Sequence, residues 1–227
     1  MSHHADHSGH AGHSDVDVSE MFTEEYWNDR YSSADRIWSG AANAQLVANA
    51  ADLAAGSALD VGCGEGADAI WLASRGWQVT GVDVSTVALK RAAIEATSAG
   101  VDIAQRITWE QADLLTWDLA PDQFDLVSAQ FIHLPPAELA ALHRQLAAAV
   151  RPGGMLLVVG HHPSDWHTSM GRPDLPHLFA TAEQMAAVLD AGDWESIDTA
   201  APQRTAIDPD GREVTIADAV LRAVRRR

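Results

Sequence analysis

From residue 56 onward, short apolar runs alternate with longer stretches of helix-forming residues. Apolar runs bounded by turn residues are typical of buried strands, and apolar positions three and four apart are typical of helices. Their alternation predicts strand–helix units and a parallel sheet with helices on both faces. The predicted strands are 59–62, 78–82, 106–111, 124–129 and 155–159, and the predicted helices are 67–74, 87–98, 136–150 and 181–190.

Two late extended runs, 194–199 and 213–223, lie on either side of the turn sequence 208–211. An Asp-Gly turn between extended runs predicts an antiparallel hairpin that closes the sheet. Upstream, residues 20–55 are rich in helix formers and predict a helical cap. We therefore expect one α/β domain over 20–227, in which a Rossmann-like, doubly wound, mostly parallel sheet (56–227) follows the cap.

The first predicted strand contains Asp60 and runs into a turn with three glycines, Gly62, Gly64 and Gly66. Glycine permits a tight turn and lets a ligand approach the backbone closely. The second predicted strand ends in Asp83, and a carboxylate there accepts hydrogen bonds from a ribose diol. Because the carboxyl ends of parallel strands meet at one edge, this pairing predicts a site for a nucleoside-containing cofactor.

The overall composition limits the partners. The chain has 227 residues, 47% of them hydrophobic, and a formal net charge of −17, which disfavours nucleic acid and anionic membrane surfaces. No apolar stretch approaches the roughly 20 residues of a membrane span. The single cysteine, Cys63, allows no internal disulfide, and we expect it to be a small buried residue. These features predict a cytoplasmic protein.

Residues 1–19 form a segment of different composition, with five histidines and few apolar side chains. Such a segment buries too little surface to offset the entropy of ordering, so we expect a disordered tail. An amino terminus, two amides and an imidazole form a nitrogen site suited to Cu(II) or Ni(II). His3, His4 and His7 are therefore candidate ligands for copper, nickel or zinc, and incidental metal affinity of a solvated tail is the alternative.

A glycine-rich turn also occurs in enzymes that bind NAD, where the usual spacing is G-x-G-x-x-G. Here the third glycine comes one residue early and Glu65 lies within the turn. A carboxylate at this place would repel a pyrophosphate, whereas a ligand with an ammonium and a sulfonium would not be repelled. An NAD-dependent oxidoreductase stays as the less favoured alternative.

Five segments resemble the class I S-adenosylmethionine-dependent methyltransferases, in the order and at the spacing of that family, over roughly residues 56–224. The segments are 59–66, 82–85, 112–114, 124–127 and 151–154. The resemblance implies S-adenosyl-L-methionine as the cofactor and a small molecule as the methyl acceptor. It also implies the following roles: Asp60, Gly62, Gly64 and Gly66 under the methionine part and ribose, Asp83 and Val84 at the ribose, Asp113 and Leu114 at the adenine, and Gln130 beside the sulfonium.

Within the cap, residues 26–31 and 38–40 resemble the lid of small bacterial tellurite-resistance and thiopurine methyltransferases. In that subgroup an aromatic residue and an arginine close over the cofactor. The resemblance implies that Trp27 or Trp38 shields the cofactor and that Arg30 pairs with its carboxylate. Core packing of the tryptophans and a surface ion pair of Arg30 are the alternatives.

Three histidines follow predicted strands: His133 after 124–129, and His161 and His162 after 155–159. Ligands bind at the carboxyl ends of strands in open α/β sheets, and histidine titrates near neutral pH. A hydroxyl acceptor needs such a base, whereas a thiolate or chalcogen oxyanion does not. We expect in-line methyl transfer to one of these acceptors; a metal-responsive protein that binds the cofactor without turnover is an alternative.

Overall fold

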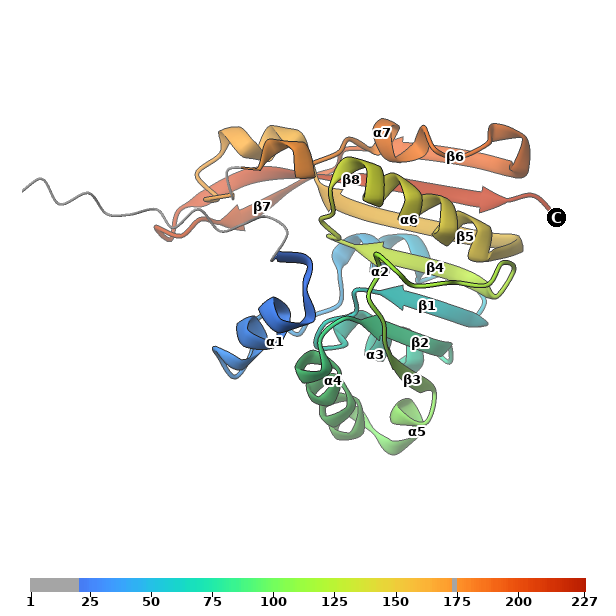
Figure 1. Cartoon of the computed structure of the whole chain (residues 1–227), viewed down its shortest axis with the longest axis horizontal. Helices are drawn as coiled ribbons and strands as arrows, with labels where there is room; N and C mark the ends of the chain where they lie inside the picture. Colours follow the sequence, from blue (N-terminus) through green and yellow to red (C-terminus); the bar gives the residue numbers. More distant parts are fainter. Residues whose placement is uncertain (1–20, 173–174) are drawn as a thin grey trace, which may run out of the picture.

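The computed structural model describes residues 21–172 and 175–227, which form an eight-stranded sheet (Figure 1). The strand order is β3-β2-β1-β4-β5-β8-β6, and β7 pairs with β8 beside this path. The first five strands in this order are parallel, and β8 is antiparallel to β5, β6 and β7. The strands are β1 (Ser57–Val61), β2 (Gln78–Asp83), β3 (Ile107–Gln111), β4 (Phe124–Gln130), β5 (Val150–His161), β6 (Trp194–Ala200), β7 (Gln203–Ile207) and β8 (Glu213–Arg225). The predicted doubly wound, mostly parallel fold is confirmed.

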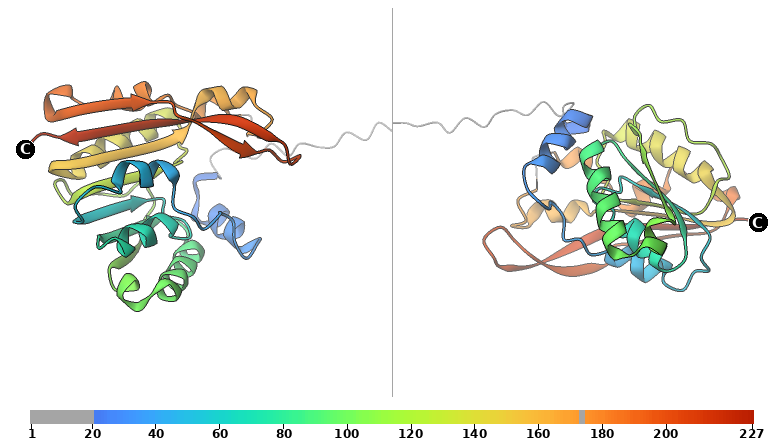
Figure 2. Two further views of the ribbon diagram at one scale, coloured as in Figure 1. Left: turned by 180° about the vertical axis from the view of Figure 1, so that it is seen from behind. Right: turned by 90° about the horizontal axis from the view of Figure 1, so that it is seen from below.

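Helices cover both faces of the sheet (Figure 2). Leu46 of α2 and Leu72 of α3 belong to the core on one face, whereas Leu146 of α6 and Met185 of α7 belong to the core on the other. The α-helices are α1 (Glu24–Ser32), α2 (Ala44–Ala50), α3 (Ala67–Ser74), α4 (Thr86–Ala99), α5 (Val101–Ala104), α6 (Pro136–Ala149) and α7 (Ala182–Ala186), and the 3-10 helices are η2 (Pro163–His167), η3 (Pro176–Leu178) and η4 (Ala191–Asp193). Helices α1 and α2 lie within the predicted cap.

Local sequence explains where several helices begin. The Ser85 hydroxyl accepts the N–H of Ala88 and caps α4, as its residue type favours. Helix α6 begins with Pro136, whose fixed φ suits a first turn. Helix α7 begins in a capping box formed by Thr181 and Gln184. It is shorter than predicted and ends at Ala186 rather than near residue 190.

The predicted antiparallel pairing of the two late runs is confirmed as β6 with β8, but the turn at 208–211 does not connect them directly. The turn at 208–211 joins β8 to β7, a strand that the sequence did not indicate, whereas β6 pairs with the C-terminal half of β8. Strand β8 is 13 residues long, so one strand pairs with β6 and β7 in succession. Pro202, which has no N–H to donate, separates β6 from β7. The turn itself depends on Asp208, whose Oδ1 accepts the N–H groups of Asp210 and Arg212 at 3.0 and 2.8 Å.

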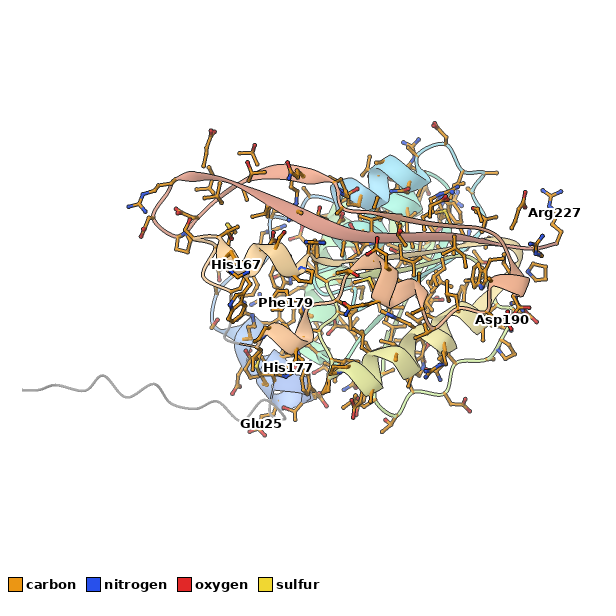
Figure 3. All side chains as sticks on the ribbon, turned by 90° about the horizontal axis from the view of Figure 1, so that it is seen from above. Glu25, His167, His177, Phe179, Asp190 and Arg227 are labelled. Atoms are coloured by element: carbon orange, nitrogen blue, oxygen red, sulfur yellow. The ribbon has the colours of Figure 1, made fainter. Side chains whose placement is uncertain are left out.

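The carboxyl ends of β1, β2, β4 and β5 lie at one edge of the sheet, since these strands are parallel. Helix α1 and strand β7 extend beyond this edge (Figure 1). Seen from above, Glu25 of α1, His177 and Phe179 lie at this end of the molecule, and Arg227 lies at the opposite end (Figure 3). The fold therefore brings the cap and the late loops to the predicted ligand edge.

None of the helices within residues 21–172 and 175–227 is long and apolar enough to cross a membrane. The predicted disordered tail, with the candidate metal ligands His3, His4 and His7, lies outside the described residues.

The interior of the sheet makes a first test of the fold. Leu157 of β5 is 0% exposed, whereas Ile94 of α4 is 65% exposed. Leu157→Ala should lower the free energy of unfolding by about 2–5 kcal/mol, through lost burial and the cavity left behind. Ile94→Ala should change it by less than about 0.5 kcal/mol. Urea denaturation measures both values, and equal effects of the two substitutions would contradict the assigned core.

Candidate active site

Three left-handed glycines form the turn between β1 and α3. Their φ angles are +65° for Gly62, +53° for Gly64 and +83° for Gly66, values that other residues rarely adopt. A Cβ atom at Gly64 would lie 2.8 Å from the Tyr31 hydroxyl, and one at Gly66 would lie 2.7 Å from the Trp109 ring. Backbone conformation and crowding both require glycine here.

The carboxylate of Asp83 at the end of β2 holds this turn. Its Oδ2 accepts the N–H of Gly64 at 2.8 Å, and its Oδ1 accepts the N–H of Ser85 at 2.9 Å. Burial raises the pKa of Asp83, and hydrogen bonds from the backbone of Ser85, Gly64 and Val84 limit the rise. Each carboxylate oxygen has further lone pairs. Asp83 therefore anchors the glycine turn and keeps acceptor capacity for a ribose hydroxyl.

Two buried acceptor atoms beside this turn have no partner within the described part of the chain: Asp60 Oδ2 and Gln130 Oε1. They belong to neighbouring strands, because Asp60 of β1 pairs in register with Ser128 of β4. The Gln130 amide donates to the Ser128 hydroxyl at 2.8 Å. Burial, with the nearby charge of Asp68, raises the pKa of Asp60 well above its usual value. Unsatisfied buried acceptors are costly, so these two atoms fit a ligand that donates hydrogen bonds and carries positive charge.

The cap brings a cation and three rings against the glycine turn. The Arg30 guanidinium lies 5.8 and 5.7 Å from the ring centroids of Trp27 and Trp38, within cation–π range. Trp38 donates from Nε1 to the Tyr31 hydroxyl at 3.0 Å, and Trp38 is 47% exposed whereas Tyr31 is 3% exposed. Trp38 is therefore no core residue. Tyr31, which was not among the predicted site residues, lies against the turn at Gly64 together with the Trp38 ring.

Glu65 faces the cap and not the ligand edge, contrary to the role that the sequence suggested. Its carboxylate accepts the N–H groups of Ile37 and Trp38 at 3.1 Å each, and it pairs with Arg91 at 3.1 Å. Arg91 also donates to the Ala34 carbonyl at 2.8 Å. The charge of Glu65 is thus compensated by α4, so repulsion by this carboxylate does not discriminate between cofactors. Glu65 instead joins the glycine turn to the cap.

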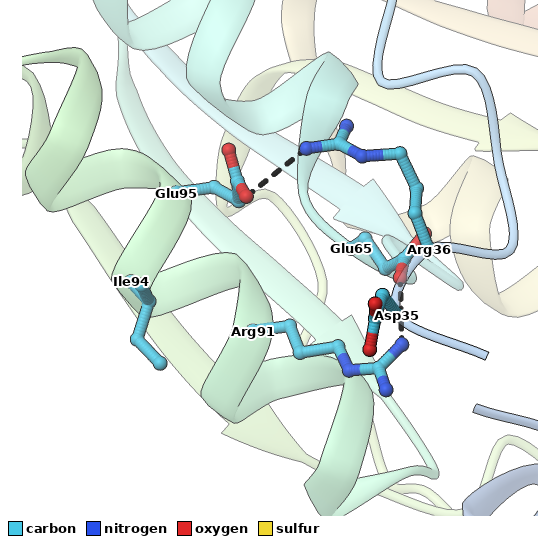
Figure 4. A pocket seen from close by; sticks show the side chains of 6 residues that line it. All are labelled: Asp35, Arg36, Glu65, Arg91, Ile94 and Glu95. Carbon is cyan, nitrogen blue, oxygen red and sulfur yellow. Dashed lines mark hydrogen bonds and ion pairs between the residues drawn. The ribbon is translucent and has the colours of Figure 1, made fainter. Parts of the chain in front are cut away.

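A hollow of about 320 Å³ lies beside this junction (Figure 4). Two ion pairs, Arg91 with Glu65 and Arg36 with Glu95, lie in this region. The lining residues are Asp35, Arg36, Glu65, Arg91, Ile94 and Glu95. Since these charges compensate one another between the cap and α4, the hollow belongs to the attachment of the cap, and the candidate site remains at the strand edge.

Asp113 and Leu114, the predicted adenine neighbours, lie in the loop after β3. Asp113 is exposed, and its Oδ1 accepts the N–H of Leu115 at 2.9 Å. Leu114 contributes to a second hollow of about 700 Å³ between this loop and α6. It is lined by Leu114, Leu115, Thr116, Trp117, Glu138, Ala141, Leu142 and Gln145. The structure therefore assigns Asp113 a local turn-forming hydrogen bond, and contact with adenine stays a prediction.

The three candidate bases have different surroundings. The His162 Nδ1 accepts the N–H of Ser164 at 3.1 Å and caps η2. Burial and the charge of Arg172 lower the pKa of His161 to about 2, so its imidazole has little affinity for a proton. Burial also lowers the pKa of His133, but a hydrogen bond with the Phe131 backbone opposes this. The structure argues against His161 and His162 as bases and leaves His133.

Residues that the sequence did not indicate complete this side of the edge. Arg172 approaches both ring nitrogens of His161 at 3.1 Å, and Phe131 stacks on the same ring with centroids 4.4 Å apart. Phe131 has a φ of +55°, a strained value for an aromatic residue. No local pattern marks these residues, because they come together through contacts between β4, β5 and the loop after η2. Burial raises the pKa of the Cys63 thiol, which fits the predicted inert, buried residue.

Comparison with known proteins shows that this chain is similar in sequence to methyltransferases. A family model described as a methyltransferase domain matches residues 58–154. The chain is 34% identical over 146 residues to methyltransferase GfsG of Streptomyces halstedii, covering 61% of this chain and 51% of the relative. It is 32% identical over 173 residues to a ubiquinone biosynthesis O-methyltransferase of Alkalilimnicola ehrlichii, covering 74% and 62%. Residues 58–154 are thus similar to a methyltransferase domain, and the strand order is that of the class I methyltransferase fold. It spans about half to three-fifths of the length of these relatives.

Solved structures share the fold. A structure from work on the conversion of a disulfide bond into a thioacetal group during echinomycin biosynthesis has a TM-score of 0.70 at 24% identity, covering 89% of this chain and 91% of the other. TehB from Haemophilus influenzae has a TM-score of 0.62 at 16% identity, covering 90% and 67%. Such identities establish the fold alone, so the proposed kinship with the tellurite-resistance subgroup is not established.

The residues at the edge fit the family's cofactor, S-adenosylmethionine. Its ammonium and sulfonium carry positive charge, and the orphaned acceptors Asp60 Oδ2 and Gln130 Oε1 suit such a ligand. The left-handed glycines lie in the same turn. These similarities favour a methyltransferase over the oxidoreductase alternative. Within residues 21–172 and 175–227 the structure shows no group of three or more His, Cys, Asp or Glu side chains placed to hold a metal ion.

The role of Glu65 in attaching the cap is testable. Glu65→Gln removes the charge that Arg91 pairs with and weakens the bonds from Ile37 and Trp38, so it should cost about 1–3 kcal/mol of stability and speed hydrogen exchange of those two amides. Glu95→Gln, which breaks the exposed pair with Arg36, should cost less than about 1 kcal/mol. Unchanged exchange in Glu65→Gln would contradict this role.

The carboxyls of Asp60 and Asp68 predict that cofactor binding depends on pH. Burial raises the pKa of Asp68 to about 6 and that of Asp60 well above its usual value. As the pH falls from 7 to 5, through the pKa of Asp68 at about 6, Asp68 takes up a proton and the surroundings of Asp60 lose negative charge that attracts an ammonium. Affinity for S-adenosylhomocysteine, measured by isothermal titration, should therefore fall over this range.

Asp68→Asn provides the matching test. This substitution removes the carboxyl that titrates near pH 6, so the affinity should fall less between pH 7 and 5 than in the unmodified protein. Asp102→Asn, at an exposed position in α5, should follow the unmodified protein. Affinity that does not change between pH 5 and 7 in the unmodified protein would contradict the contribution of Asp68 to the charge of the site.

Proposed function

We propose that the protein transfers a methyl group from S-adenosylmethionine to a hydroxyl oxygen of a small molecule, with His133 as the base. The position and state of His133 carry this proposal. It lies three residues beyond the end of β4 at the ligand edge, and its lowered pKa keeps the imidazole neutral at physiological pH. A neutral imidazole accepts a proton, as removal of a hydroxyl proton requires.

The cofactor is held, in this proposal, by residues from each element at the edge. Asp60 accepts from the ammonium, Asp83 accepts from the ribose, and the glycine turn lets the ligand approach the backbone. The remaining proposed contacts are Val84, Asp113, Leu114 and Gln130 from the strand ends, and Trp27, Arg30 and Trp38 from the cap. Two observations support these proposed contacts: the residues lie around the glycine turn, and Asp60 Oδ2 and Gln130 Oε1 have no partner within the described residues.

The chemical work of the protein is positioning and proton transfer. Bound S-adenosylmethionine supplies a methyl group on a positively charged sulfur, so transfer to the acceptor oxygen leaves a neutral thioether and requires one proton to leave the hydroxyl. His133 takes that proton. The strand ends and the cap orient the acceptor and exclude water, which are the main sources of rate when the electrophile is already activated.

The relatives support an oxygen acceptor. Several of them are named as ubiquinone biosynthesis O-methyltransferases, and the chain aligns with 74% of its length to one of these. A thiol or chalcogen oxyanion acceptor, also considered from the sequence, would ionise without help. The need for a base therefore separates these acceptor classes.

Methyl transfer from labelled S-adenosylmethionine to a panel of phenols, alcohols and thiols tests the proposal. His133→Ala should lower kcat for a hydroxyl acceptor by about 10²–10⁴-fold, the usual contribution of a general base. His162→Ala, which removes the cap of η2, should retain kcat within a few-fold. Transfer to thiols alone, with kcat unchanged in His133→Ala, would contradict the proposal.

A further inference from the structure

A cluster of five rings, His161 among them, lies at the carboxyl ends of β4 and β5. Phe131 stacks on His161 at 4.4 Å between centroids, and His133 lies 5.4 Å from the same ring. Phe179 lies 5.7 Å from His133, and Trp166 lies 6.2 Å from Phe179. The rings come from β4, β5, η2 and the end of η3, so a planar ligand would meet aromatic surface from several elements.

Arg172 places an incompletely paired cation against these rings. Its side chain is 16% exposed, and its buried Nε has no partner within the described residues. Its terminal nitrogens approach both ring nitrogens of His161, but a neutral imidazole has a single acceptor nitrogen. A guanidinium has five N–H donors. Besides its contacts with His161 and with Asp165 Oδ2 at 3.4 Å, Arg172 therefore keeps a buried Nε donor without a partner among the described residues, at a place where unpaired charge is costly.

Of the nearby carboxylates, one pairs with Arg172 at long distance and the other pairs with Arg204. Asp165 approaches Arg172 at 3.4 Å, and its other oxygen accepts the N–H of Ala217 at 2.9 Å. Asp218 accepts twice from Arg204, at 3.1 and 3.0 Å, and once from Gln45. Arg204 thus has a close partner, whereas Arg172 has a distant one. Arg172 is the cation of this cluster that best suits an external anion.

We propose that the acceptor is a planar hydroxylated carboxylic acid, whose carboxylate pairs with Arg172 and whose ring packs among Phe131, Phe179 and Trp166. The inference rests on the proposed function, since it names the substrate class of that site. Guanidinium and carboxylate match in bidentate geometry, and such charge-assisted bonds are about twice as strong as neutral ones. Aromatic walls with one convergent cation are a typical arrangement for a small ligand.

This arrangement also affects the base. The charge of Arg172 contributes to the low pKa of His133. A carboxylate on Arg172 would compensate that charge and raise the affinity of His133 for the hydroxyl proton. The other charged groups of the cluster, Asp165, Arg204 and Asp218, already form the ion pairs described above. Binding of the acid would therefore both orient the acceptor and strengthen the base.

A matched pair of probes tests the substrate class on the full-length protein saturated with S-adenosylhomocysteine. The probes are 3,4-dihydroxybenzoate and its neutral counterpart 3,4-dihydroxybenzamide, and binding is measured by isothermal titration. The unmodified protein should bind the acid at least about tenfold more tightly than the amide, because the acid pairs with the partly buried guanidinium of Arg172. Arg172→Gln should bind the acid and the amide with about equal affinity, and Arg172→Lys should retain part of the preference for the acid. Arg212→Gln, which alters an exposed arginine at the turn between β7 and β8, should leave the preference unchanged.

The outcomes separate the two proposals. Equal affinity for the acid and the amide in the unmodified protein would overturn the inference, and this comparison does not require a folded variant. A preference for the acid that persists in Arg172→Gln would also overturn it. Turnover of neutral catechols without preference for the acid would overturn the inference and leave the proposed function standing. Arg172-dependent binding of the acid, without methyl transfer to it or to any hydroxyl, would support the anion subsite and overturn the proposed function.

Discussion

The hydrogen bond from the Gly64 N–H to the Asp83 carboxylate is the contact on which the site depends. It joins the turn after β1 to the end of β2, so two strands that are neighbours in the sheet share one rigid loop. The same carboxylate accepts from Ser85 at the start of α4. A single buried side chain therefore fixes the glycine turn, the strand end and the helix start, and every other candidate group is positioned relative to these elements.

The buried polar groups on the two sides of this turn differ in whether they have hydrogen-bond partners. On the cap side, Glu65 has Arg91 and two backbone N–H groups as partners, and the junction is electrostatically complete. On the strand side, Asp60 and Gln130 each keep an acceptor atom without a partner in the described chain. Since proteins rarely leave buried acceptors unsatisfied, the contrast distinguishes the contact that attaches the cap from the one that suits a ligand.

The histidines show why residue type and position do not define a role. His133, His161 and His162 all follow strands at the same edge, yet one caps a 3-10 helix, one loses its proton affinity beside Arg172, and one keeps a usable imidazole. These differences arise from desolvation and from charges within a few ångströms. The aromatic cluster and Arg172 give the proposed substrate region apolar walls and a positive charge. The proposed cofactor region instead contains the hydrogen-bond acceptors of Asp60 and Gln130.

Much of the fold could be predicted from the sequence, because strand runs, the glycine turn and the cap at Ser85 depend on neighbours within a few residues. Helix α3 has the predicted bounds of 67–74, and the family could be recognised from the short segments along β1 to β5. Only the tertiary structure decided that β8 pairs with both β6 and β7, that Glu65 turns to the cap, and that Arg172 reaches His161. Those features depend on burial and on contacts between residues far apart in the chain, and a local sequence pattern carries no record of either.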